Sequence, residues 1–181
     1  HTREALGDRA TVLCQDLVEL ALPEPVDVVF SNATFHWIPD HDALFAALAR
    51  NMKPGGRLVA QCGGKGNIDR LRTLAEEIAS EPQWAPYFAD WEGVWNYAGA
   101  EETAERLQRA GFAEIHTWLE PRPTALPEDD GRTFVASVCL IRHLDRIPAE
   151  RRDAFVDGLL ARYREPVVLD YVRLNMTATR R

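Results

Sequence analysis

The 181-residue sequence predicts an α/β protein with an open, mostly parallel β-sheet that carries an antiparallel edge strand. Two observations support this fold class. Two apolar segments, 26–32 and 57–63, flank an amphipathic helical segment at 40–52, which is the pattern of a β-α-β unit. A last segment at 170–180 alternates apolar and polar residues, as a half-buried antiparallel strand does. The β-α-β unit predicts parallel pairing with a right-handed crossover.

The first two expected strands both end in polar side chains. A short apolar run at 10–16 ends in Asp16 and is expected to be a buried strand. The strand at 26–32 ends in Ser31 and Asn32. Ligands of open α/β sheets bind beyond the carboxyl ends of the parallel strands. Position alone therefore nominates the ends of these two strands as a binding site.

The helix expected at 40–52 connects the second and third strands. Its large apolar residues recur at a spacing of four, and either Asp40 or Asp42 can cap its first turn. Pro54 forces the helix to stop, and two glycines then turn the chain into the strand at 57–63.

The rest of the chain is expected to be mostly helical. The expected elements are helices at 67–80 and 100–112, a strand at 113–121, helices at 133–144 and 148–164, and the strand at 170–180. Residues at helical spacing mark the expected buried faces of the last two helices: Phe134, Val138 and Ile141, and then Phe155, Leu159 and Tyr163.

The segment 82–98 has no sheet character but is rich in aromatic residues. It contains two prolines, so it cannot form one long helix. Its aromatic residues are Trp84, Tyr87, Phe88, Trp91, Trp95 and Tyr97. We expect residues 1–181 to form a single, incomplete domain, in which helical insertions at about 66–98 and 132–165 make a lid over an acceptor site.

The composition excludes several classes of function. Hydrophobic residues make up 46% of the chain, charged residues 27%, and the net charge is −7. An acidic protein lacks the basic surface that nucleic acids require, although a local arginine cluster can still hold a small anion. No apolar run is long enough to span a membrane, and the first residues contain no apolar leader. We therefore expect a cytoplasmic protein that binds a small molecule and neither nucleic acid nor membrane; its oligomeric state stays open.

The three cysteines, Cys14, Cys62 and Cys139, are widely separated. Their number and spacing indicate neither a disulfide framework nor a zinc site. Two of them fall in expected strands, where a small buried thiol is the ordinary interpretation. No metal is expected.

Residues 26–59, "VDVVFSNATFHWIPDHDALFAALARNMKPGGRLV", resemble the middle of class I S-adenosylmethionine-dependent methyltransferases. The motif Asn-Ala-x-x-His-Trp at 32–37, followed by Met-Lys-Pro-Gly-Gly at 52–56, is especially similar to the trans-aconitate methyltransferase-like group. The order of strands and helices extends this resemblance over nearly the whole chain. The resemblance implies a Rossmann-like methyltransferase sheet and S-adenosylmethionine as cofactor.

The resemblance also implies cofactor-binding roles for individual residues. Asp16 would accept a hydrogen bond from the adenine amino group, and Leu17 would offer its backbone N–H to the ring. Backbone groups of Asn32 and Ala33 would hold the methionine amino end. Trp37 would lie near the sulfonium, because a cation is attracted to the face of an aromatic ring.

The resemblance implies that His36 lines the same wall near the sulfonium. His36 is also the candidate catalytic residue, because an amine or hydroxyl acceptor needs a base and no other residue is as obvious. A carboxylate acceptor would need none. The candidate acceptor-binding residues, all in the expected lid, are Trp95, Tyr97, Arg142 and His143.

Each candidate also has a purely structural interpretation. Asp16 can cap a helix that starts near residue 18, and Asn32 can serve only its turn. His36 can be a structural hydrogen bonder and Trp37 a packing residue. The four lid candidates can be packing residues or part of a solvated helix face.

The resemblance does not include the first part of the family's sheet. The family's strand order is 3-2-1-4-5-7-6, and the first two strands, with the glycine-rich loop that wraps the cofactor, have no counterpart here. We therefore expect that residues are missing before His1; alternatively, these residues pair differently from the family.

Two hypotheses of function remain. The first is methyl transfer from S-adenosylmethionine to a small-molecule acceptor, for which a carboxylate is one candidate. The alternative is a non-catalytic methyltransferase-like binding module that has lost its cofactor loop and uses the aromatic segment as a partner surface. A nicotinamide-linked oxidoreductase shares the sheet type but gains nothing from the 32–37 motif.

Overall fold

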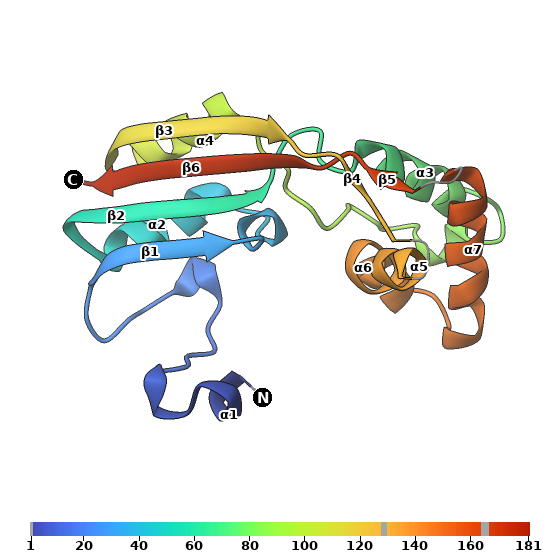
Figure 1. Cartoon of the computed structure of the whole chain (residues 1–181), viewed down its shortest axis with the longest axis horizontal. Helices are drawn as coiled ribbons and strands as arrows, with labels where there is room; N and C mark the ends of the chain where they lie inside the picture. Colours follow the sequence, from blue (N-terminus) through green and yellow to red (C-terminus); the bar gives the residue numbers. More distant parts are fainter. Residues whose placement is uncertain (1, 128–129, 164–166) are drawn as a thin grey trace.

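The computed structural model describes residues 2–127, 130–163 and 167–181, and these form two adjoining parts (Figure 1). The first, the sheet body, contains a four-stranded sheet and the helices packed on it. The second, the helical body, contains the segments that follow β2 and β3. The expected lid boundaries at 132–165 extend over residues 164–165, which lie outside the described residues.

The sheet has the strand order β1-β2-β6-β3. Strand β1 (Val26–Asn32) pairs in parallel with β2 (Met52–Gly63), which confirms the expected β-α-β unit. Strand β6 (Val172–Arg180) lies antiparallel between β2 and β3 (Phe112–Pro121). This order matches the 4-5-7-6 part of the order that the resemblance implies.

One face of the sheet is covered by two helices, α2 (His41–Arg50) and α4 (Ala100–Arg109) (Figure 1). Asp40 caps α2, because its Oδ1 accepts the backbone N–H of Ala43 at 2.8 Å. Alternate residues of β2 and β6 point into the core below these helices. The buried strand residues are Leu58, Ala60, Cys62, Leu174, Met176 and Ala178.

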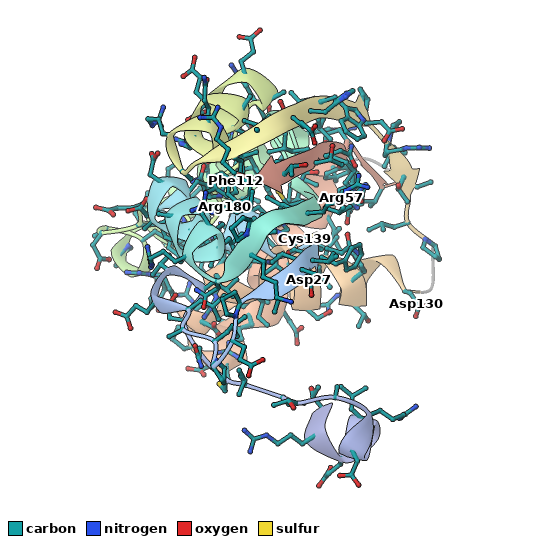
Figure 2. All side chains as sticks on the ribbon, turned by 90° about the vertical axis from the view of Figure 1, so that its left-hand side faces the viewer. Asp27, Arg57, Phe112, Asp130, Cys139 and Arg180 are labelled. Carbon is teal, nitrogen blue, oxygen red and sulfur yellow. The ribbon has the colours of Figure 1, made fainter. Side chains whose placement is uncertain are left out.

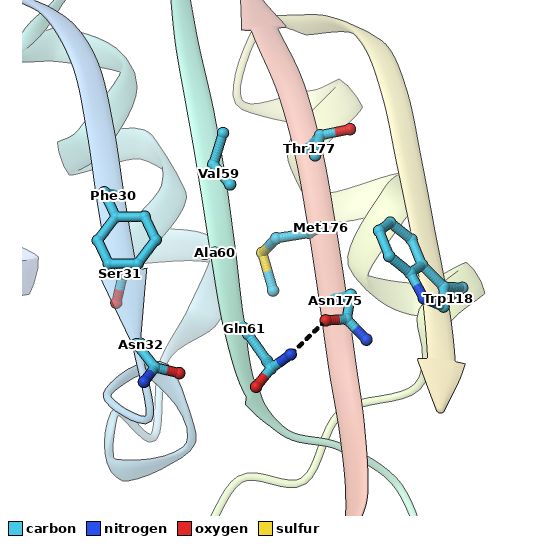
Figure 3. A pocket seen from close by; sticks show the side chains of 10 residues that line it. All are labelled: Phe30, Ser31, Asn32, Val59, Ala60, Gln61, Trp118, Asn175, Met176 and Thr177. Carbon is cyan, nitrogen blue, oxygen red and sulfur yellow. Dashed lines mark hydrogen bonds between the residues drawn. The ribbon is translucent and has the colours of Figure 1, made fainter. Parts of the chain in front are cut away.

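The opposite face of the sheet, seen in close-up in Figure 3, carries exposed side chains such as Phe30 and Trp118, and we call it the open face. Residues of all four strands line a hollow there, some of them through backbone atoms only: Phe30, Ser31, Asn32, Val59, Ala60, Gln61, Trp118, Asn175, Met176 and Thr177. On β1, Val28 is 58% exposed and Phe30 is 75% exposed. No described strand pairs with the outer edge of β1.

The helical body lies beyond the carboxyl end of β1 (Figure 1). Its elements are α3 (Asp69–Ala79), α5 (Gly131–Phe134), a π-helix (Val135–Cys139), α6 (Ile141–Asp145), α7 (Arg152–Tyr163) and the two-stranded pair β4 (Thr124–Ala125) and β5 (Val168–Leu169). As expected, α7 buries Phe155, Leu159 and Tyr163, and the segment 82–98 contains no long helix.

The helix expected at 133–144 is interrupted, and its expected buried face was wrong. Val138 and Ile141 are 45% and 44% exposed, whereas Val135, Cys139 and His143 are buried. The π-helical turn is the reason, since a wider turn rotates the following residues relative to a regular helix. Leu140 then separates the π-helix from α6.

The strand expected at 10–16 was also wrong. Residues 11–16 form neither strand nor helix, and Cys14 is exposed rather than buried. A strand needs a neighbour for its backbone groups, and none of the described strands lies beside this segment. Helix α1 (Thr2–Leu6), which precedes it, lies apart from the sheet (Figure 2).

Two further sequence expectations concern β2 and membranes. β2 begins at Met52, earlier than expected, and its pairing with β1 is irregular where the glycines lie, between the Val26 and Val28 positions. Within the described residues, no helix combines the length and the apolar character needed to cross a bilayer.

Candidate functional site

The segment that follows β1 turns sharply and places His36 against the end of β2. Ala33 adopts a left-handed conformation, with a φ of 56°, which is uncommon for a residue other than glycine. A 3₁₀ turn, Phe35–Trp37, comes next, and its His36 side chain is 8% exposed. The backbone N–H of Gly63 donates to Nδ1 of His36 at 3.1 Å. The end of β2 therefore fixes the orientation of the imidazole ring.

This hydrogen bond also determines the protonation of His36. Nδ1 acts as the acceptor, so the hydrogen of the neutral ring resides on Nε2. Burial, as the largest cause, together with the charges of Arg173 and His41 lowers the pKa of His36 to about 4. At neutral pH, His36 is an uncharged ring that carries its hydrogen on Nε2.

Five rings from both parts of the molecule form an aromatic cluster: His36, Trp37, Trp95, Tyr97 and His143. The His36 ring centroid lies 5.1 Å from that of Trp37 and 5.8 Å from that of Tyr97. Trp95 stacks on Tyr97 at 5.8 Å with an interplanar angle of 8°. Trp95 also lies 6.2 Å from Trp37 and 5.6 Å from His143. The structure thus brings together candidates from three separate segments of the sequence, 36–37, 95–97 and 143.

Two glycines at the end of β2 allow this close packing. A Cβ atom added to Gly63 would meet Cε1 of Tyr97 at 2.6 Å and Nδ2 of Asn67 at 2.8 Å. A Cβ atom on Gly64 would meet the side chains of Leu119 and Leu174 at 2.5 Å and 2.7 Å. Sequence analysis missed both glycines, although a Gly-Gly pair at a strand end is a signal of close approach.

The end of β1 leaves polar groups at the open face of the sheet. The side chain of Asn32 makes no hydrogen bond to the described residues, and Figure 3 shows it beside Gln61. The Ala33 N–H donates to the Gln61 carbonyl at 2.8 Å. The Ala33 N–H is therefore already used within the sheet body. A cationic amino group needs oxygen acceptors, which the Asn32 amide can supply.

Asp16 and Leu17 lie on the loop before β1, away from the aromatic cluster. Asp16 is exposed, and its Oδ1 accepts the N–H of Val18 at 3.1 Å, which caps the 3₁₀ turn Leu17–Glu19. The structural interpretation of Asp16 as a cap is confirmed, and its adenine-binding role stays a prediction. Leu17 packs against the core of the sheet body.

The two neighbouring lid candidates Arg142 and His143 have different surroundings. Arg142 is exposed and lies 3.8 Å from Asp145, outside the aromatic cluster. His143 is 1% exposed, and its Nδ1 has no hydrogen-bond partner among the described residues. Burial lowers the pKa of His143 to about 4. Only His143 of these two joins the candidate site.

Metal chemistry finds no support in the described part of the chain. No group of three or more histidine, cysteine, aspartate or glutamate side chains there could hold a metal ion. Cys62 and Cys139 are buried, and burial raises the pKa of each thiol to about 12. These thiols are core residues with no thiolate character at neutral pH.

The chain is similar to known methyltransferases. A family profile described as a methyltransferase domain matches residues 1–60. The trans-aconitate 2-methyltransferase of Rhizobium meliloti is 39% identical over 177 residues, which cover 91% of this chain and 67% of the relative. The protein of the same name from Rhizobium rhizogenes is 30% identical over 176 residues, covering 92% of this chain and 68% of the relative. The chain thus spans about two thirds of the length of these relatives.

A solved structure supports the fold alone. The YcgJ protein of Bacillus subtilis aligns with 92% of this chain and 69% of its own, at 15% identity and a TM-score of 0.52. The sequence relatives favour an enzyme over a binding module that has lost its cofactor. The chain belongs to the class I S-adenosylmethionine-dependent methyltransferases, in the trans-aconitate methyltransferase-like group.

Proposed function

We propose that the protein transfers a methyl group from S-adenosylmethionine to a carboxylate oxygen of a small organic acid. The methyl donor is the cofactor of the family to which the chain belongs. The names of the two relatives suggest trans-aconitate as the first acid to test.

One observation carries the choice of a carboxylate: the Gly63 N–H donates to Nδ1 of His36. The remaining Nε2–H is a hydrogen-bond donor, and the pKa of about 4 makes the ring a weak base at neutral pH. An amine or hydroxyl acceptor would need to lose a proton during the reaction, and this tautomer has no free lone pair to take it. A carboxylate is already ionised and can accept the Nε2–H bond. His36 therefore orients the acceptor rather than deprotonating it.

The residues at the end of β1 suit the methionyl part of the cofactor. The unpaired Asn32 amide offers an acceptor to its amino group, and the Trp37 and Tyr97 rings offer faces to a cation. When bound, the cofactor supplies an electrophilic methyl group on a positively charged sulfur. The chain's own part is to hold the acceptor oxygen in line with that methyl group and to exclude water.

The partial burial of the aromatic cluster favours such a reaction. Opposite charges on the acceptor and the donor cancel as the methyl group moves, so a less polar environment than water lowers the barrier. His143 and the stacked Trp95–Tyr97 pair supply apolar surface on the side of the helical body.

The direct test is methyl transfer by the full-length protein to trans-aconitate, followed by mass spectrometry and by mild alkaline hydrolysis. We expect a monomethyl ester that alkali converts back to the acid. His36→Gln keeps a side-chain donor and should retain more activity than His36→Phe, which keeps only a ring. An alkali-stable methylated product, or equal activity of the two variants, would contradict the proposal.

A further inference from the structure

Arg173 occupies the position on β6 that faces Gly63 of β2. Residues that face each other in an antiparallel ladder point their side chains to the same face, with Cβ atoms about 5 Å apart. The previous pair on the same face of this ladder is Gln61–Asn175, whose side chains are joined by a 2.6 Å hydrogen bond on the open face (Figure 3). Arg173 therefore projects from the open face, one step closer to the helical body.

Gly63 connects Arg173 with the candidate site. The Gly63 N–H holds His36, and the Tyr97 ring fills the space where a Gly63 Cβ would lie. Arg173 is thus next to both side chains across a single glycine. Its charge also contributes to the lowered pKa of His36 and reaches the Cys62 thiol, which agrees with a short separation.

The positive charge of Arg173 has no acidic partner in the described part of the chain. No described carboxylate oxygen lies within 4.0 Å of its guanidinium group. Glu120 faces Arg173 from β3, but the Glu120 carboxylate pairs with Arg122 at 2.6 Å instead. The Arg173 guanidinium carbon lies 4.2 Å from the centroid of the Tyr171 ring, which supports the group without neutralising it.

We infer that Arg173 binds a carboxylate group of the acceptor, beside the carboxylate that the Nε2–H of His36 orients. A guanidinium group binds a carboxylate through two parallel hydrogen bonds, so it fixes both position and direction. An acceptor with two or more carboxylates can then engage His36 and Arg173 together. This inference rests on the proposed function and deepens it, because it makes the preferred substrate class polycarboxylates rather than acids in general.

The sequence gives no sign of this role. Arg173 alternates with apolar residues in a strand, where a solvated polar side chain is the ordinary interpretation. Only the pairing of β6 with β2 reveals its neighbours, because Gly63 and Arg173 are distant in the sequence.

The test compares Arg173→Gln with Arg57→Gln in the full-length protein. Arg57 lies in the middle of β2 on the same face as Gly63, six residues before it in the sequence, and no described carboxylate pairs with it (Figure 2). The two variants therefore lose the same charge from one face. Binding of trans-aconitate in the presence of S-adenosylhomocysteine is followed by tryptophan fluorescence, and KM and kcat are measured separately.

We expect Arg173→Gln to weaken trans-aconitate binding by about 10-fold or more, since a charged hydrogen-bonding partner is lost. The KM should rise by a similar factor, while S-adenosylhomocysteine affinity and the unfolding midpoint stay close to wild type. Arg173→Lys should recover part of the loss. Arg57→Gln should change the affinity less than about twofold, as expected for a distant exposed charge. Crotonate, a monocarboxylate, should respond less to Arg173→Gln than trans-aconitate does.

The outcomes separate this inference from the proposed function. Methyl transfer with an unchanged KM in Arg173→Gln would overturn the inference and leave the function standing. Binding of trans-aconitate that depends on Arg173, without any methyl transfer, would uphold the inference and overturn the function. Equal loss of acid and S-adenosylhomocysteine binding would assign Arg173 to the cofactor site or to the fold, and would overturn the inference. If the wild-type protein binds neither trans-aconitate nor crotonate, both the inference and the proposed function are overturned.

Discussion

The sheet body and the helical body are held together by different kinds of contact. The core of the sheet body consists mainly of aliphatic side chains packed between regular strands and two helices. The helical body also has a mainly aliphatic core, but it adds partly buried rings and arginines over rings, such as Arg151 over Trp84 at 4.6 Å and Arg146 over Trp91 at 5.5 Å. The candidate site lies where the two parts meet. The difference teaches that the hydrogen-bonded end of the sheet orients the site, whereas rings of the helical body surround it.

The largest effect should come from removing the central ring of the helical body. Phe155 is fully buried and lies 5.2 Å from Trp84 and 5.8 Å from Phe88. Phe155→Ala should cost about 3–5 kcal/mol of unfolding free energy in denaturant titrations. The control Val138→Ala removes a half-exposed side chain of the same part and should cost less than about 0.5 kcal/mol.

Hydrogen exchange on Phe155→Ala tests whether the two parts are separate units of stability. We expect faster exchange in α3 and α7, with the amides of β2 and β6 still protected. Equal loss of protection in both parts would show that they unfold together, and the contrast between them would then be one of composition only.

A smaller effect should come from the glycine that joins the two parts. Gly63→Ala forces its new Cβ against Tyr97 and Asn67, which should cost about 1–3 kcal/mol and shift the fluorescence of the neighbouring Trp95. Gly158→Ala is the matched control, because its Cβ would meet nothing within 4 Å inside α7. That control should stabilise the protein by up to about 1 kcal/mol. Equal changes in unfolding free energy for the two substitutions would contradict close packing at Gly63.

Two buried histidines, one in each part, should make the stability of the protein depend on pH. Burial lowers the pKa of both His36 and His143 to about 4 in the folded protein, from an ordinary value of 6.5. Between pH 6.5 and 4 the unfolded chain therefore binds protons that the folded chain does not, so stability falls as pH falls. Above pH 6.5 this contribution is complete and constant. Unfolding free energies at pH 7.5 and 4.5 should differ less in His143→Phe than in wild type; an identical difference would contradict the low pKa of His143.

The smallest effect on stability should come from Asp16, which lies far from the junction. Asp16→Ala removes an exposed cap and should cost about 1 kcal/mol or less. Its effect on S-adenosylhomocysteine affinity, measured by calorimetry, tests the predicted adenine contact. Glu19→Ala removes the same charge from the same exposed turn and serves as the control. Equal affinities of the two variants would move adenine recognition to another residue.

The regular elements of the sheet body were predictable because each has a clear period. The alternation in β6 and the spacing of four in α2 directly report which residues face the core. The prediction of a strand at 10–16 was wrong because an apolar run shows strand propensity but cannot show whether a neighbouring strand exists. The predicted burial of Val138 and Ile141 was wrong because the prediction assumed a regular helix where a π-helix forms.

The candidate site was predictable only in part, for a similar reason. A motif in one segment pointed to His36 and Trp37, and the aromatic richness of 82–98 pointed to Trp95 and Tyr97. Arg173 could not be predicted, because its role depends on strand pairing across more than one hundred residues. Long-range register leaves no local signal in a single sequence.

The account depends most on the state of His36, which nitrogen NMR of histidine-labelled protein measures directly. The signals of His36 can be assigned by their loss in His36→Gln. The account predicts a neutral ring between pH 6 and 8, with the hydrogen on Nε2 and a bare Nδ1 that accepts the Gly63 N–H. A hydrogen on Nδ1, or an imidazolium in that pH range, would contradict it, because Nε2 would then be free to act as a base or the ring would be charged.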